Sequence, residues 1–417
     1  MSPKAKKSES SFTAGIIANA TKALVLKSTG HKPLEASFST TPHVDSGSLI
    51  INALIGGSAT KDGKGMVCPG YPRRKITEIF GPESSGKTSV ALAAAVQVQK
   101  AGGTVMFLDF EHAIHHGYAK AIGVTYDDSF MVFAPDTMEE GLKMIWIGIN
   151  TGVDLIIVDS VAAMVPQDEL DKKLDETAKV GAVAKKMSET FPKLAGWLAT
   201  CPKTGTGEAK KTDPTKLGTA LILLNQERAT IGNTGPGEPT NTAGGKAVKY
   251  YASLRLRFSR TGSEIIEKKD PLTGKSKRFP YGNKTKVKIV KNKLDGTQGQ
   301  DGEFFIRYGF GVDNYFSVIE TGSSQGVVKK EGAGYYTFGE HRIQGRDKFR
   351  AFLVENPKVY ADLCAKVTAA IASSATVIKD EDIDEEDSLL SRMDDDLGSS
   401  GGGQEDEEQV VEASDAE

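Results

Sequence analysis

Between residues 76 and 224, short apolar segments rich in strand-forming residues alternate with longer segments of helical periodicity. The predicted strands cover 76–80, 104–109, 154–158 and 219–224, and the predicted helices cover 87–101, 138–150 and 178–199. Buried apolar strands that alternate with helices are typical of a parallel sheet with helices on both faces. The pattern therefore predicts an α/β core with a mainly parallel sheet.

The pattern changes after residue 251, where polar and apolar positions alternate with a period of two. Three further strands are predicted at 252–258, 284–291 and 303–308, and we expect them to be antiparallel additions at one edge of the sheet. A basic hairpin lies between the first two. A small α+β C-terminal domain should follow at 316–378, with a helix near 358–372.

The two ends of the chain differ from this core. Residues 12–27 have the spacing of a short amphipathic helix, which could pack on its own domain or dock outside it. Residues 379–417 are acidic and Ser/Gly-rich, and no regular structure is predicted there. The predicted organisation is an N-terminal helix and linker at 1–44, a core at 45–315, a C-terminal domain at 316–378 and a tail at 379–417.

Composition limits the protein class. The chain has 417 residues, 39% apolar and 26% charged, which is ordinary for a globular protein. No apolar run is long enough to cross a bilayer, and no secretory segment follows the basic N-terminus. Three widely spaced cysteines give no disulfide or metal-site pattern, so we expect a reducing, cytoplasmic environment.

The formal charge of −3 hides an uneven distribution. Residues 379–417 contain seventeen acidic and two basic residues, a charge of −15, which leaves +12 on the first 378 residues. A basic body with an acidic tail indicates a polyanion partner and a tail that competes for the same surface. A tail that only adds solubility is the alternative interpretation.

The sequence GPESSGKT after the first predicted strand fits the phosphate-loop pattern at every fixed position. Its glycines allow backbone N–H groups to surround phosphate oxygens, and the following helix presents the positive end of its dipole. Lys87 can reach the outer phosphates, and the Thr88 hydroxyl can hold Mg²⁺. The predicted nucleotide-binding residues of this segment are Gly81, Pro82, Glu83, Ser84, Ser85, Gly86, Lys87, Thr88 and Ser89.

Polar side chains follow three other predicted strands at the same sheet edge. Asp159 ends an apolar strand and could hold Mg²⁺ through water. Either Glu111 or Asp109 could be a general base for an attacking water, and position alone does not separate them. Gln226 immediately precedes the Gly/Pro-rich loop 227–245. Its side-chain amide could sense a terminal phosphate and act as a switch.

Taken together and in order, these segments resemble the RecA family of homologous-recombination ATPases. The similar segments are GPESSGKT, FLDFEHA, LIIVDS, LLNQERATIG, TAGGKAVKYYASLRLRF and TKVKIVKNK, within residues 45–375. The resemblance implies a RecA-type phosphate-loop fold. The insertions and unusual termini favour a phage-encoded or otherwise divergent member.

The resemblance assigns roles around the nucleotide, which it implies is ATP with Mg²⁺. Glu111 becomes the general base, Gln226 the phosphate-sensing switch and Asp159 the Mg²⁺-associated carboxylate. Tyr118 matches a tyrosine that stacks on adenine. Lys291 and Lys293 match a lysine pair that reaches the nucleotide of the neighbouring subunit, so that hydrolysis requires a filament.

The resemblance also implies contacts with DNA and with other subunits. Two loops, about 166–181 and 227–245, would hold single-stranded DNA, and the N-terminal helix would dock on the adjacent subunit. The implied DNA-binding residues are Lys172, Lys173, Lys179, Arg228, Ile231, Gly244 and Gly245. The implied interface residues are Lys249, Tyr250 and Arg255.

This chain departs from the family pattern in three places. His115 stands where the family has an aspartate near adenine, which puts base selectivity in question. Residues 202–217 are an insertion, and the hairpin at 263–283 is longer and basic. The C-terminal domain is expected to capture duplex DNA, with the acidic tail as a restraint, through Lys329, Lys330, Arg342, Arg346, Lys348 and Arg350.

The sequence therefore predicts an ATP-dependent recombinase that forms a helical homo-filament on single-stranded DNA and pairs it with a homologous duplex. Single-strand-binding and mediator proteins are further candidate partners. A hexameric, RecA-fold DNA helicase is the alternative enzyme class. A non-catalytic binder of nucleotide and DNA is a third class, which the complete set of catalytic residues disfavours.

Overall fold

The structure is a computed structural model that describes residues 27, 41–56, 68–171, 181–199, 203–204, 211–212, 217–229, 240–269, 274, 276–294 and 298–374. The predicted N-terminal helix and acidic tail, and most of the 202–217 insertion, lie outside these residues. Contacts divide the chain into Met1–Thr41 and Pro42–Glu417, and the sheet and its helices belong to the second unit. No helix in the described part of the chain is long and apolar enough to cross a membrane.

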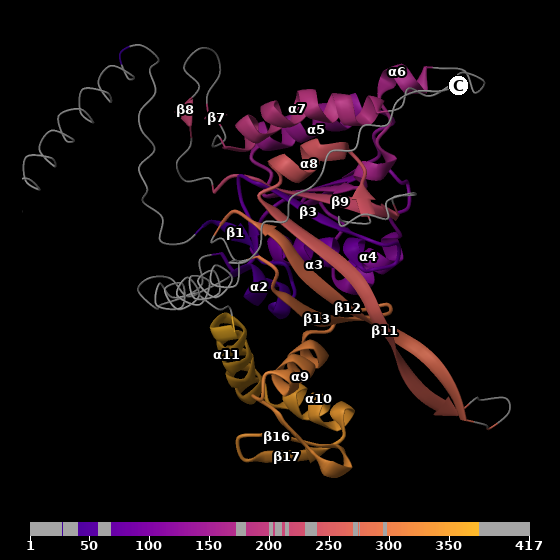
Figure 1. The fold of residues 1–417 in the computed structure, drawn as a ribbon, viewed down its shortest axis with the longest axis vertical. Coiled ribbons are helices and arrows are strands. Elements are labelled where there is room, and N and C mark those ends of the chain that lie inside the picture. The colour runs from indigo at the N-terminus through magenta and orange to yellow at the C-terminus, as the bar shows by residue number, and fades with distance from the viewer. Residues whose placement is uncertain are drawn as a thin grey trace, which may run out of the picture. The chain divides into compact units, whose positions relative to one another are not determined.

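A large mixed sheet forms the centre of this unit (Figure 1). Its strands lie in the order β14-β13-β12-β11-β3-β9-β6-β4-β5, with β10 paired to β9. Their bounds are β3 (Ile76–Gly81), β4 (Val105–Asp109), β5 (Phe130–Phe133), β6 (Leu155–Asp159), β9 (Ala220–Ala229), β10 (Thr240–Thr242), β11 (Leu254–Lys269), β12 (Ser276–Asn292), β13 (Asp301–Arg307) and β14 (Gly311–Val312).

The mainly parallel core with antiparallel strands at one edge is confirmed, with one correction. The strand predicted at 252–258 was expected to be antiparallel, but β11 runs parallel to β3 and antiparallel only to β12. The chain reaches β11 through the helix α8 (Gly245–Tyr251), and such a crossover allows parallel pairing. The antiparallel part of the sheet therefore begins one strand later, at β12.

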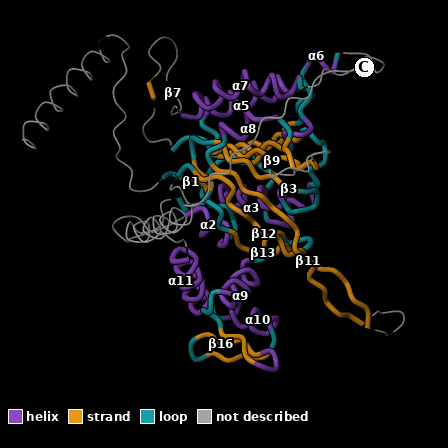
Figure 2. Tube along the Cα trace, in the orientation of Figure 1, coloured by secondary structure: helices purple, strands orange, loops and turns teal. Residues whose placement is uncertain are grey.

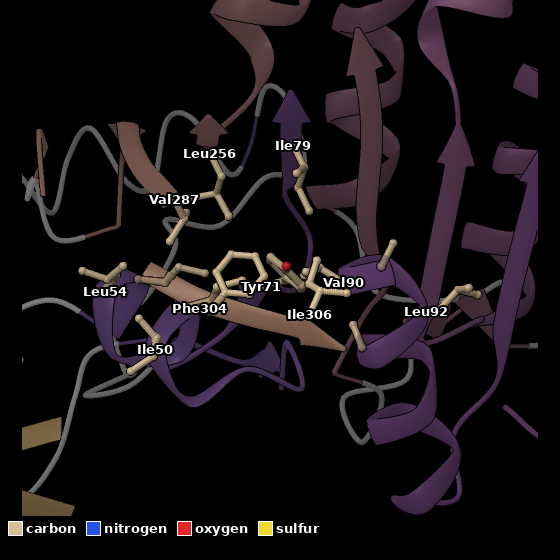
Figure 3. Packing of buried hydrophobic residues seen from close by; sticks show 14 of the residues in the cluster. Ile50, Leu54, Tyr71, Ile79, Val90, Leu92, Leu256, Val287, Phe304 and Ile306 are labelled. Carbon is tan, nitrogen blue, oxygen red and sulfur yellow. The ribbon is translucent and has the colours of Figure 1, made fainter. Parts of the chain in front are cut away.

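Alternating side chains of the central strands enter two separate cores. In β6, Leu155 and Ile157 join one buried cluster while Ile156 and Val158 join the other. The first core, seen in Figure 3, includes α2 (Leu49–Gly56), α3 (Lys87–Lys100) and α4 (His116–Ile122). The second includes α5 (Met138–Thr151), α7 (Ala182–Ala199) and α8. Helices thus cover both faces, as the strand composition predicts.

The C-terminal region is a small α+β unit (Figure 2) that follows β14 in the chain. It contains α9 (Asn314–Ser324), β15 (Lys329–Glu331), β16 (Tyr335–Phe338), β17 (His341–Gln344), α10 (Arg346–Glu355) and α11 (Pro357–Ser374). Smaller elements of the chain are β1 (His43–Val44), β2 (Tyr71–Pro72), α6 (Gln167–Leu170), β7 (Lys203–Thr204) and β8 (Lys211–Thr212).

The β11–β12 hairpin extends away from the sheet (Figure 1) and is anchored at its base to the C-terminal region. Arg346 at the start of α10 forms ion pairs with Glu264 of β11 and Glu320 of α9. Its guanidinium also lies 4.7 Å from the ring centre of Phe316. Burial opposes the charge, but these carboxylates hold the Arg346 pKa above its usual value.

Candidate nucleotide site

The phosphate loop connects β3 to α3 and packs closely against the antiparallel strands. A Cβ at Gly81 would lie 2.1 Å from the Phe258 carbonyl oxygen, and one at Gly86 would lie 2.0 Å from the Ile306 side chain. Gly86 also has φ of 90°, which favours glycine. A side chain at either position would clash with these neighbours, so the loop requires both fixed glycines of the motif. The loop leads directly into the N-terminus of α3, as the sequence predicts.

Lys87 and Thr88 occupy the first turn of α3. The Lys87 ammonium donates to the carbonyl oxygens of Gly81 and Pro82, at 3.1 and 2.8 Å. Burial lowers the Lys87 pKa, and the negative charges of Asp159 and Glu111 oppose this change. Lys87 is thus a partly desolvated cation at the loop, which suits contact with phosphate.

The donor set for a divalent cation lies between Thr88 and Asp159. The Thr88 hydroxyl donates to Asp159 Oδ2 at 2.8 Å. Burial raises the Asp159 pKa to about 6, and the nearby carboxylates of Glu111 and Asp109 add to the increase. Oxygen ligands in a region of unbalanced negative charge fit Mg²⁺.

Two carboxylates lie at the end of β4 and just after it, and they have different surroundings. Asp109 is 4% exposed and accepts hydrogen bonds from the backbone N–H groups of Ala113 and Ile114. Glu111 is exposed and accepts from the Ser160 hydroxyl and, at 3.0 Å, from Gln226 Nε2. Asp109 therefore shapes the loop after β4, whereas Glu111 is accessible and adjacent to Gln226.

Tyr118, which the resemblance places beside adenine, lies in α4. The Tyr118 hydroxyl lies 2.7 Å from that of Ser89 in α3, and His115 Nδ1 accepts a hydrogen bond from the Tyr118 N–H at 3.0 Å. His115 is therefore the N-cap of α4, a place where aspartate is also favoured. The histidine preserves the local fold that orients Tyr118.

Comparisons with known proteins agree with this arrangement. Residues 40–313 match the RecA N-terminal domain, and residues 317–372 match the RecA C-terminal domain. The chain belongs to the RecA family. Membership makes it a RecA-type recombinase for homologous recombination and DNA repair, and a DNA-dependent ATPase.

Three relatives and one solved structure illustrate the similarity. RecA of Salinispora arenicola is 38% identical, and the match covers 73% of this chain and 80% of the relative. RecA of Saccharopolyspora erythraea is 40% identical, and the match covers 74% of this chain and 81% of the relative. RecA of Lactiplantibacillus pentosus is 35% identical, and the match covers 84% of this chain and 82% of the relative. The structure of the RadB recombinase is 16% identical, with a TM-score of 0.42 over 64% of this chain and 98% of that one. These relatives are bacterial, so the expectation of a phage origin is not supported.

The lysine pair of the RecA-like segment VKNK lies at the end of β12. Lys291 donates to the carbonyl oxygens of Lys249 and Tyr250, at 2.6 and 3.0 Å, at the C-terminal end of α8. Burial lowers the Lys291 pKa to about 8, and the positive charges of Lys293 and Arg255 contribute. Tyr250 is 67% exposed. The hydrogen bonds of Lys291 thus go to the end of α8 and not to the phosphate loop.

Arg255, implied to be an interface residue by RecA resemblance, lies inside this chain. It is 5% exposed, and its Nε donates to Glu78 at 2.6 Å. Its guanidinium also lies 4.6 Å from the centre of the Phe80 ring. Direct contact with a neighbouring subunit would require this pair to open, so any effect of Arg255 at an interface would be indirect.

The described parts of the two RecA-like DNA loops are their stems. Gly244 has φ of 83° and begins α8 as its N-cap, followed by Gly245 with φ of 66°. Arg228 lies in β9 opposite Asn241 of β10. The predicted residues Lys172, Lys173, Lys179 and Ile231 lie outside the described residues. Gln226 thus lies directly before the segment 227–245 that the resemblance implies to be a DNA loop.

Several contact residues were not predicted. Ser160 was noted only as the neighbour of Asp159, although its hydroxyl contacts Glu111. The buried residues Asn225 and Glu78, which are hydrogen-bonded to each other, were not singled out. A polar residue inside an otherwise apolar strand was the available signal, since buried polar groups require partners.

Proposed function

We propose that this protein binds ATP and Mg²⁺ between adjacent subunits of a helical filament on single-stranded DNA and pairs that strand with a homologous duplex. The contact between Gln226 and Glu111 carries the proposal, because it joins the reaction centre to the stem of the DNA loop. Sequence specificity in this account comes from base complementarity. Backbone contacts to phosphate would make binding salt-sensitive and largely sequence-independent.

Glu111 is proposed as the general base that accepts a proton from the attacking water. Its Oε1 accepts hydrogen bonds from Ser160 and Gln226. If Gln226 moves toward the terminal phosphate, it leaves this oxygen of Glu111 free to accept a hydrogen bond from the attacking water. Phosphate sensing and positioning of the water then occur in the same movement.

Thr88 and Asp159 would hold Mg²⁺, which supplies charge neutralisation and orientation of the phosphates. Lys87 would bind the outer phosphates, and the backbone N–H groups of the loop would surround them. Tyr118 would pack against the base. The described N-cap contact of His115 supports this position of Tyr118, so the histidine is compatible with nucleotide binding.

Lys291 and Lys293 are proposed to complete the site of the neighbouring subunit. Burial and the nearby charges of Lys293 and Arg255 lower the pKa of Lys291, so its cation is poorly stabilised within its own chain. A phosphate of the next subunit would supply a negative partner and stabilise charge in the transition state. Hydrolysis would therefore depend on assembly.

The opposite edge of the sheet offers a surface for assembly. β5 is the last strand in the sheet order, with Phe133 38% exposed. Trp146 and Ile147 of the adjacent α5 are 44% and 41% exposed. Open edges and clustered exposed apolar groups are typical of interaction sites. We propose that a neighbouring subunit, through its N-terminal segment, covers them.

The C-terminal domain is proposed to capture duplex DNA. Lys329 and Lys330 of β15 are exposed, whereas Arg342 and Arg346 already bind carboxylates. The exposed lysines are therefore the better candidates for phosphate contact. The acidic tail would compete with DNA for this surface. The proposed location is the cytoplasm, where single-strand-binding and mediator proteins would assist loading.

The proposal is tested by ATP hydrolysis with and without single-stranded DNA, followed by joint-molecule formation between circular single strands and homologous linear duplex. We expect strong DNA stimulation and joints that require homology. Electron microscopy on the same samples should show helical filaments. Closed rings with strand-unwinding activity and no homologous joints would overturn the proposal in favour of a hexameric motor.

A further inference from the structure

A polar network is buried at the centre of the sheet. Glu78 of β3 is 0% exposed and lies beside Arg255 of β11 in the parallel register. Its Oε2 accepts from Arg255 Nε at 2.6 Å, and its Oε1 accepts from Asn225 Nδ2 at 2.9 Å. Asn225 on β9 is also 0% exposed. Three adjacent strands thus contribute one polar group each to a single buried cluster.

Such a cluster is an unfavourable way to gain stability. Burying a charged pair carries a desolvation cost that apolar residues of similar size would avoid. The neighbouring positions of β3 and β9 contain Ile79 and Leu224, both buried in the same sheet. A buried ion pair can instead specify one arrangement of the groups around it, and the contacts of Asn225 indicate which groups these are.

Asn225 fixes the backbone on both sides of the DNA loop. Its Oδ1 accepts the N–H of Gln226 at 2.9 Å, and its Nδ2 donates to the carbonyl oxygen of Ala243 at 2.9 Å as well as to Glu78. Both amide hydrogens and the carbonyl oxygen are therefore used. Asn225, the residue before Gln226, thus holds the end of the loop that leads into α8.

Lys291, the strand partner of Arg255, holds the C-terminal end of α8. Arg255 lies directly opposite Lys291 in the β11–β12 pairing. Lys291 donates to the carbonyl oxygens of Lys249 and Tyr250, at the C-terminal end of α8. The helix that follows the DNA loop is therefore held at its start through Asn225 and at its end through Lys291.

We propose that Asn225, fixed by the buried Glu78–Arg255 pair, is the positioning residue that transmits occupancy of the DNA loop to both halves of the ATP site. This inference rests on the proposed function of that site. A shift of the Ala243 stem on DNA binding pulls on the Asn225 amide, which also holds the Gln226 peptide. The same shift moves α8, whose far end holds Lys291. DNA binding at the loop therefore affects both Gln226, in the chain's own ATP site, and Lys291, in the site of the neighbouring subunit.

The test compares Asn225→Ala with Ser317→Ala as a matched control. Ser317 is 0% exposed, and its hydroxyl accepts from the Phe305 N–H and donates to the Asp313 carbonyl, so it contacts neither Asn225 nor the Glu78–Arg255 pair through these bonds. Both variants lose buried hydrogen bonds. Each is measured for affinity to a fluorescent ATP analogue, affinity to single-stranded DNA, and the ratio of DNA-stimulated to DNA-independent ATP hydrolysis.

We expect Asn225→Ala to keep both affinities within about threefold and to lose about tenfold or more of the stimulation ratio, a typical size for coupling between sites. Ser317→Ala should keep the ratio. A wild-type ratio in Asn225→Ala would overturn the inference and leave the proposed function standing. Absence of stimulation in the wild-type protein would instead overturn the proposed function.

A second variant keeps the test decisive if Asn225→Ala does not fold. Glu78→Gln retains an oxygen acceptor for Asn225 but removes the ion pair with Arg255. We expect partial losses of stimulation in Glu78→Gln and in Asn225→Ser, and in the double variant Glu78→Gln/Asn225→Ser a loss smaller than the sum of these two single effects, because both act through one network. A fully wild-type ratio in Glu78→Gln, or additive losses, would contradict the proposed pathway.

Discussion

Gln226 Nε2 donates a hydrogen bond to Glu111 Oε1 at 3.0 Å, although 115 positions separate the two residues in the sequence. β9 and β4 bring them together across β6, at the edge where the phosphate loop also begins. The proposed phosphate sensor and the proposed general base therefore share one contact. Changes to either side chain, or to the charges around them, should alter ATP turnover in ways that can be told apart.

The first prediction separates the two carboxylates at the end of β4 and just after it. Glu111→Gln should lower DNA-stimulated ATP hydrolysis by about 10²- to 10⁴-fold with little change in ATP affinity, because it removes only proton transfer. Asp109→Asn should mainly lower thermal stability, because Asp109 supports the backbone of Ala113 and Ile114. Near-normal turnover in Glu111→Gln would exclude it as the base.

The second prediction concerns the pH dependence of Lys291, whose pKa is lowered to about 8. The cation is present below this pKa and is lost as pH rises through it, so turnover should fall on the alkaline side. Phosphates of the neighbouring subunit would stabilise the cation and move the midpoint upward from 8. Lys291→Arg should shift the fall to still higher pH, since guanidinium remains protonated. Identical alkaline limbs in both proteins would contradict this assignment.

The third prediction concerns the cap of α4. His115→Ala removes the acceptor for the Tyr118 N–H and should destabilise the protein by about 0.5–2 kcal/mol. We also expect weaker ATP binding, because Tyr118 loses its orientation. His115→Asp should preserve both properties, which can be measured by thermal unfolding and nucleotide titration. A loss of ATP affinity in His115→Asp equal to that in His115→Ala would indicate that the imidazole contacts the base directly.

The fourth prediction concerns the acidic tail. Truncation after Ile378 removes a charge of −15 and should strengthen duplex binding and lessen its demand for Mg²⁺ or salt, because the tail no longer competes for the basic surface. The control is a full-length chain in which the tail acids are replaced by Asn and Gln. If only the truncation, and not the neutral tail, changes affinity, length rather than charge is responsible.

The sequence predicted the elements that have strong periodicity or a fixed chemical motif. The phosphate loop could be predicted from its motif. β4, β6 and β9 could be predicted because each is an apolar strand with a polar residue at the same edge of the sheet. It did not predict β5 (Phe130–Phe133), whose four residues are too few to show a period, or α4, which contains only seven residues. The parallel pairing of β11 with β3 depends on tertiary contacts and was assigned wrongly.

The site was predicted less completely than the fold. Glu111, Gln226 and Asp159 could be placed at one edge by strand order, but their mutual contacts could not. The cluster of Glu78, Asn225 and Arg255 comes from three strands separated by up to 177 positions, and no local pattern reveals it. Arg255 was placed at an interface only by the family resemblance, whereas in the structure it pairs with the buried carboxylate of Glu78.

The central claim is that neighbouring subunits share each ATP site, and it is tested most directly by mixing two inactive variants. Glu111→Gln lacks the base, and Lys291→Ala/Lys293→Ala lacks the cations offered to the next subunit. In mixed filaments on single-stranded DNA, about a quarter of the interfaces at equal amounts would pair an intact base with intact lysines. We predict that ATP hydrolysis recovers to a comparable fraction of the wild-type rate. No recovery in filaments that demonstrably contain both variants would contradict a shared site.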